Sequence, residues 1–95
     1  MIDDPAIEAL RQRIDAIDHR LLELLAERLT VVHQVGQEKR RKTLPVFDPA
    51  REELLLQKLV CDAPQGFDEE AVRAIFLAVV SQCRRLEGQA LQSDD

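Results

Sequence analysis

The sequence predicts an all-α domain of three helices, long, short and medium, that pairs with a second copy as an intertwined six-helix homodimer. Two Asp-Pro steps, at Asp4-Pro5 and Asp48-Pro49, are typical helix starts, because aspartate caps free backbone N–H groups and proline fits the first helical position. Apolar residues recur at alternating spacings of three and four, which indicates helices rather than strands. The 95 residues are expected to form a single domain, residues 1–95.

The first helix is expected from Pro5 to about Lys42, and Leu44-Pro45 ends it because a residue before proline disfavours the α conformation. One stripe of this helix holds apolar residues with a single arginine among them: Ile7, Leu10, Ile14, Ile17, Leu21, Leu24, Arg28, Val31 and Val35. At 1.5 Å per residue the helix is about 55 Å long, more than the rest of one short chain can cover. The stripe therefore predicts that two copies pair their long helices in antiparallel fashion.

The second helix is expected from Pro49 to about Asp62, and three consecutive leucines, residues 54–56, predict that it is covered on much of its circumference. Asp68 is expected to cap the third helix, which should reach at least Glu87. Gly36 weakens the first helix by about 1 kcal/mol relative to alanine, so we expect it to let another backbone or a ligand come close.

The formal net charge of −5 argues against a nucleic-acid partner, because affinity for nucleic acid comes mostly from cations that neutralise phosphates. The sequence shows neither a secretory leader nor an apolar run of 18 residues, so we expect a cytoplasmic protein and no membrane partner. The polar tail after the third helix favours a free-standing protein. No Gly-rich phosphate loop or nucleophile-elbow serine is present, and we expect no metal and no cofactor.

Several residues have plain structural interpretations. Cys61 and Cys83 lack metal or redox spacing and are expected to be buried thiols. His19 and His33 lack the Glu-x-x-His spacing of di-iron bundles and are expected at the surface or in the seam. The cations at residues 40–42 are expected to be solvated at the end of the first helix, where they complement its dipole.

Four other cations fall on or beside the packed sides of the predicted helices: Arg11, Arg28, Lys39 and Arg51. Burying an unpaired charge is costly, so Arg28, within the apolar stripe, needs an anionic partner. Arginine binds both oxygens of a carboxylate, and the set therefore indicates a small polyanion such as a dicarboxylate. The alternative is a set of interhelical salt bridges to the acids Asp18, Glu27, Glu52 and Glu53.

Helix geometry limits which cations can share one ligand. Along the first helix Arg28 and Lys39 are about 16 Å apart, and Arg11 and Arg28 about 25 Å apart. Long side chains let Arg28 and Lys39 reach toward one small ligand, whereas Arg11 can join them only from an antiparallel partner chain.

Two pairs of candidate residues are four positions apart on one helix. Asp48 caps the second helix, and Glu52 either compensates the helix dipole or accepts a hydrogen bond from a substrate hydroxyl. On the third helix Cys83 fits the apolar stripe as a core thiol, and Glu87 lies near the packed face, where an acid is unusual.

Together these residues resemble the all-α class of chorismate mutase. The resemblance covers about residues 6–90 and rests on four segments: IEALRQRIDAIDHRLLELLAERL, VGQEK, PVFDPAREELL and FLAVVSQC. It implies a helical homodimer with two active sites, each of which takes one arginine across the interface. The implied activity is the pericyclic conversion of chorismate to prephenate, for phenylalanine and tyrosine synthesis, without cofactor or covalent intermediate.

The resemblance also implies roles for the candidate residues. Arg11 of the partner subunit and Arg28 would hold the two carboxylates of chorismate, its substrate. Lys39 would bond the ether oxygen, where negative charge grows as the C–O bond breaks. Asp48 and Glu52 would bind near the ring hydroxyl. Arg51 would support the pocket.

The third helix departs from the common family pattern of Ser and Gln, because this chain has Cys83 and Glu87 at the matching positions. A glutamine can donate to the ether oxygen at any pH, whereas Glu87 can do so only when protonated. The rate is therefore expected to fall as pH rises, and Glu87→Gln should flatten that profile.

Two other functions remain open from the sequence. Isochorismate pyruvate lyase shares this fold and its cations, and a non-catalytic helical dimerisation module would need no pocket. We expect no second site for a regulating amino acid.

Overall fold

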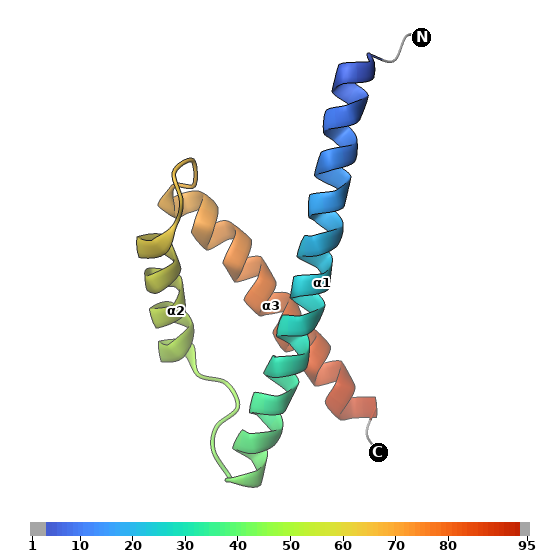
Figure 1. Ribbon diagram of the computed structural model, residues 1–95. Coiled ribbons are helices and arrows are strands. Elements are labelled where there is room, and N and C mark those ends of the chain that lie inside the picture. Colours follow the sequence, from blue (N-terminus) through green and yellow to red (C-terminus); the bar gives the residue numbers. More distant parts are fainter. Residues whose placement is uncertain (1–3, 94–95) are drawn as a thin grey trace. The chain divides into compact units, whose positions relative to one another are not determined.

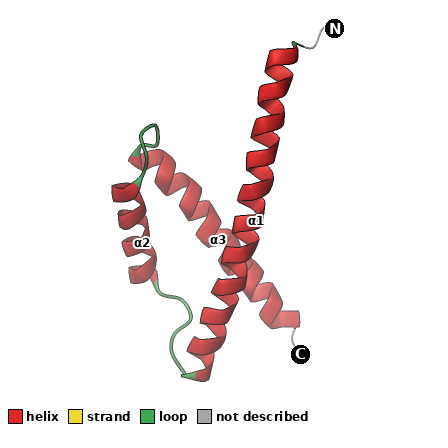
Figure 2. Cartoon of the chain, in the orientation of Figure 1, coloured by secondary structure: helices red, strands yellow, loops and turns green. Residues whose placement is uncertain are grey.

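The computed structural model describes residues 4–93, with side-chain burial for residues 4–89, and it contains three helices (Figures 1 and 2). They are α1 (Pro5–Arg41), α2 (Pro49–Asp62) and α3 (Glu69–Ser93), and no strand occurs among these residues. The prediction of an all-α fold with long, short and medium helices is confirmed. The sequence left the end of α3 open, and the helix continues through Gly88.

Each helix start has the cap that the sequence predicts. Oδ1 of Asp4 accepts a hydrogen bond from a backbone N–H two residues on, at 2.8 Å. Oδ1 of Asp48 and of Asp68 accepts one from the N–H three residues on, at 3.0 Å and 2.8 Å. Each aspartate thus satisfies a donor that the first turn leaves unpaired, as an N-cap does.

The end of α1 involves a feature that the sequence analysis did not identify. Thr43 has φ 58°, in the left-handed region, and among the described residues it is the only non-glycine residue with positive φ. The N–H of Thr43 bonds the carbonyl of Arg40 at 3.1 Å, and the N–H of Leu44 bonds that of Lys39 at 2.7 Å. This cap ends the helix just before the connector, residues 44–48, which carries part of the candidate site.

The chain divides into two compact units, residues 1–31 and residues 32–95. In the first unit the apolar stripe of α1 is exposed in the single chain, with side chains 49–58% accessible: Ile7, Leu10, Ile14, Ile17, Leu21 and Leu24. The sequence predicts that a second copy buries this stripe, and that homodimer remains a prediction.

In the second unit α2 and α3 lie side by side (Figure 1). The buried core of this unit consists of Leu56 from α2 and of Val72 and Cys83 from α3. Leu54 is 60% exposed, so in the single chain α2 is covered on one side, not on much of its circumference as predicted. The prediction of two buried cysteines is right for Cys83 and wrong for Cys61, which is exposed because it lies off the covered side of α2.

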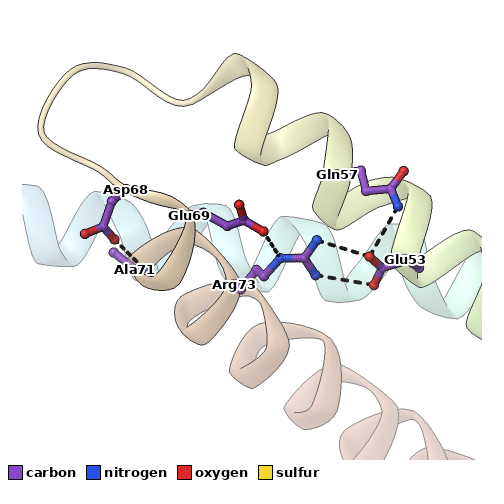
Figure 3. A network of polar contacts seen from close by, with 6 residues as sticks. All are labelled: Glu53, Gln57, Asp68, Glu69, Ala71 and Arg73. Atoms are coloured by element: carbon purple, nitrogen blue, oxygen red, sulfur yellow. Dashed lines mark hydrogen bonds and ion pairs between the residues drawn. The ribbon is translucent and has the colours of Figure 1, made fainter.

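A polar network also joins α2 to α3 (Figure 3). Arg73 donates to Glu53 at 3.1 and 3.4 Å and to Glu69 at 2.9 Å, and Gln57 donates to Glu53 at 3.3 Å. The hydrogen bond from Arg73 lowers the pKa of Glu53 below its ordinary value of 4.5, and the two carboxylates raise the pKa of Arg73. The network stabilises the α2–α3 pair through contacts between side chains that water still reaches.

Candidate functional site

The predicted site residues fall in both units of the chain. The second unit contains six of them: Lys39, Asp48, Arg51, Glu52, Cys83 and Glu87. Arg11 and Arg28 belong to the first unit, where Arg11 is exposed and Arg28 is half-buried. The contacts among candidate residues described below lie within the second unit, and the roles of Arg11 and Arg28 remain predictions.

Lys39 contacts the connector between α1 and α2. Its side chain is half-buried, and Nζ donates a hydrogen bond to the carbonyl of Val46 at 3.4 Å. The contact holds a cation beside the segment that leads into Asp48 and the start of α2. Oδ1 of Asp48 is engaged in the helix cap, as predicted, and Arg51 in the first turn is exposed.

Glu52 forms an interhelical ion pair with Arg84 of α3. The guanidinium of Arg84 also lies 4.1 Å from the centroid of the Phe47 ring, in a cation–π contact. Arg84 thus joins α3 to both the connector and the first turn of α2. The sequence analysis missed Arg84, since nothing in the pattern distinguishes it from the neighbouring Arg85.

Glu87 lies against the C-terminal part of α1. Its side chain is 12% exposed, and Oε1 is buried without a hydrogen-bond partner among the described residues. Arg40 is exposed, as predicted, and its Nη1 also lies 3.9 Å from this oxygen. An acid on α3 and a cation on α1 therefore face each other.

Gly36 makes this approach of Glu87 possible. It is the buried residue of α1, and a Cβ added there would overlap Oε1 of Glu87 and lie 3.2 Å from its Cδ. The predicted close approach at Gly36 is thus present, but a side chain makes it rather than a backbone or a ligand.

The histidines agree with the prediction of surface or seam positions. His19 is exposed, and its Nδ1 lies 2.7 Å from the carbonyl of Asp15. His33 is half-buried, with Nε2 lacking a hydrogen-bond partner within residues 4–93. In that same part of the chain no three His, Cys, Asp or Glu side chains group in a way that could hold a metal ion. Nor does any helix there combine the length and apolar character needed to cross a membrane.

Residues 10–88 match the family model for chorismate mutase type II. The chain is 37% identical over 93 residues to the bifunctional chorismate mutase/prephenate dehydratase of Pseudomonas aeruginosa, covering 92% of this chain and 25% of that relative. It thus spans about a quarter of the relative's length. It is also 30% identical over 91 residues to a 4-amino-4-deoxychorismate mutase of Streptomyces pristinaespiralis, covering 95% of this chain and 70% of that protein.

A solved structure shares the fold over nearly the whole chain. The chorismate mutase from Helicobacter pylori, in complex with prephenate, matches with a TM-score of 0.87 and 27% identity. The match covers 97% of this chain and 100% of that one. The resemblance inferred from the sequence is therefore confirmed at the level of family and fold.

Proposed function

The chain belongs to the family of type II chorismate mutases, and we propose on that premise that it converts chorismate to prephenate. In this reaction one C–O bond breaks as one C–C bond forms within the same molecule. Such a step needs groups that hold the substrate in its reactive shape and stabilise the charge that develops. We propose a role in phenylalanine and tyrosine synthesis and a cytoplasmic location.

The observation that carries the proposal is a connected set of charged groups from all three helices, in which Lys39, Glu52 and Glu87 are half-buried and Arg84 is exposed. Lys39 contacts the carbonyl just before Phe47, Phe47 contacts Arg84, and Arg84 pairs with Glu52. Glu87 lies one helical turn beyond Arg84, beside the same end of α1. These contacts support the proposal because they gather cations and acids, the groups that a small polar anion with a hydroxyl would need, near the connector.

The proposed roles follow the charges of the substrate. Lys39 donates to the ether oxygen, where negative charge grows as the C–O bond breaks, and Arg28 with Arg11 of the partner subunit holds the carboxylates. Glu52 accepts from the ring hydroxyl, and Asp48 lies near that hydroxyl. The pocket is further lined or supported by Arg51 and Cys83.

Glu87 is proposed as a second donor to the ether oxygen. Its Oε1 is buried beside Gly36 and has no hydrogen-bond partner within the described part of the chain, so the carboxyl group is held at this place without being committed to a protein donor. Protonation is required, so the contribution of Glu87 should decline as pH rises.

The proposed assembly is a homodimer in which the α1 stripes cover each other. Six large apolar side chains exposed along one stripe are more than a soluble single chain ordinarily leaves uncovered. An antiparallel partner would bury them and would bring its Arg11 toward the opposite end of α1.

A second candidate substrate is 4-amino-4-deoxychorismate, in which an amine replaces the ring hydroxyl. The similarity to the Streptomyces pristinaespiralis protein favours it. The pairing of Glu52 with Arg84 favours chorismate instead, because a carboxylate that already has a cationic partner attracts an ammonium group less strongly.

The first test is the loss of chorismate absorbance with purified protein at pH 5 and pH 7.5, with the product identified as prephenate. Faster turnover at pH 5 would support both the mutase and Glu87 as a protonated donor. Equal turnover at the two pH values would keep the mutase and remove that role of Glu87. No turnover at either pH would overturn the proposal and favour isochorismate pyruvate lyase, tested by salicylate formation, or a dimerisation module.

A further inference from the structure

Arg84 is placed to influence the part of the site that meets the substrate ring. It pairs with Glu52, and its guanidinium stacks on Phe47, the residue directly before Asp48. Both contacts therefore lie beside the two acids, Asp48 and Glu52, that the proposed function assigns to the ring hydroxyl.

We propose that Arg84 is a positioning residue that makes the site select a hydroxyl over an amine on the substrate ring, an inference that rests on the proposed function. Paired with Arg84, the Glu52 carboxylate still has lone pairs that accept a hydrogen bond from a neutral hydroxyl. An amine carries a proton at neutral pH, so it would bring a second cation close to the guanidinium. This repulsion works against the amine substrate without weakening the hydroxyl contact.

The stacking on Phe47 gives the pair a fixed geometry. The side chains of Arg84 and Glu52 are 49% and 30% exposed, and an ion pair this open to water is weak and mobile when nothing else restrains it. A planar guanidinium held over a ring loses much of that freedom, and its edge then faces the carboxylate. The ring therefore keeps the cation close to the place where the substrate substituent would lie.

The chain offers a matched control for this contact. Arg73 and Glu53 form another α3–α2 ion pair, at 3.1 Å, with Glu53 adjacent to Glu52 in sequence. The hydrogen bonds of Arg73 go to Glu53 and Glu69, and the proposed function gives Arg73 no part. Replacing Arg73 should therefore weaken the packing of α2 against α3 as replacing Arg84 does. It should leave unchanged the residues proposed to lie near the hydroxyl or amine of the substrate.

The experiment measures kcat/KM for chorismate and for 4-amino-4-deoxychorismate in the wild type, Arg84→Met and Arg73→Met. We expect Arg84→Met to lower the chorismate-to-amine ratio by about tenfold, equivalent to about 1.4 kcal/mol, whereas Arg73→Met should leave it within about twofold. In a Glu52→Gln background, Arg84→Met should no longer change the ratio, because the carboxylate on which Arg84 acts is gone.

An unchanged ratio in folded Arg84→Met, or an equal change in Arg73→Met, would overturn the role of Arg84 while leaving the mutase intact. A wild type that turns over neither compound would instead overturn the proposed function, and this inference with it. If circular dichroism shows that Arg84→Met is unfolded, Arg84→Gln, which keeps a polar side chain beside Glu52, is judged by the same ratios.

Discussion

Replacing Gly36 by alanine should reduce catalysis while leaving the protein at least as stable as the wild type. Gly36 lies inside α1, where alanine favours the helix by about 1 kcal/mol relative to glycine. The new methyl group would overlap Oε1 of Glu87 and approach its Cδ to 3.2 Å. That oxygen has no hydrogen-bond partner among the described residues, so the side chain can turn away at the cost of a single long ion pair, the 3.9 Å contact with Arg40.

The size of the effect follows from the displacement. The carboxylate must move by about 1 Å or more to reach ordinary contact distance, and a misplacement of about 1 Å can cost about 100-fold in rate. We therefore expect kcat/KM for chorismate to fall by up to about 100-fold if Glu87 contacts the substrate. The melting temperature should stay level or rise by at most about 4–8 °C, the shift that about 1 kcal/mol produces in a domain of this size.

Gly88→Ala is the matched control for this substitution. Gly88 also lies inside a helix, α3, but a Cβ added there meets no atom within 4 Å. It should gain helix stability and keep wild-type kcat/KM. Steady-state kinetics and thermal melts of both variants test the argument. Wild-type kcat/KM in Gly36→Ala would refute it, because the Glu87 carboxylate would then have no catalytic position to lose.

Three further predictions concern the charged residues. Glu87→Gln should give a kcat/KM that no longer declines between pH 5 and pH 8, and a profile as steep as that of the wild type would contradict the donor role. Arg28→Ala should lower kcat/KM by about 100-fold, the typical cost of removing one preorganised electrostatic contact, while size-exclusion chromatography shows an unchanged assembly; unaltered turnover would count against Arg28 as a carboxylate ligand. Because the folded pKa of Glu53 lies below its ordinary value of 4.5, its contribution to stability is present above that value and is lost as pH falls through the folded pKa. Glu53→Gln should therefore show a smaller drop in melting temperature between pH 6 and pH 3 than the wild type, and an equal drop would exclude this contribution.

Local signals in the sequence were sufficient to predict the helices. Asp4, Asp48 and Asp68 each cap a helix as expected, because a cap depends only on the next three residues. The end of α1 was expected from Leu44-Pro45. The left-handed conformation of Thr43, which also ends the helix, could not be predicted, since threonine rarely adopts it. Cys61 was misplaced because an apolar stretch of sequence does not show which side of α2 is covered.

The candidate site was predicted less completely, because its contacts join distant parts of the chain. Gly36 was recognised as a point of close approach, yet the sequence could not name Glu87, which lies 51 positions further on, as the group that approaches it. The missed ion pair of Arg84 with Glu52 spans 32 positions.

Charge content explains why such pairs escape sequence analysis. With 13 Lys and Arg and 18 Asp and Glu in the chain, many opposite-charge pairs satisfy helical spacing equally well. Arg84 and Arg85 are adjacent and chemically identical, but on a helix they point about 100° apart, and the structure pairs Arg84 with Glu52 and Arg85 with Gln82. Which of the two faces Glu52 depends on how α3 packs against α2 around the buried Leu56. A residue such as Arg84 can therefore be assigned a role only after the packing of the helices is known.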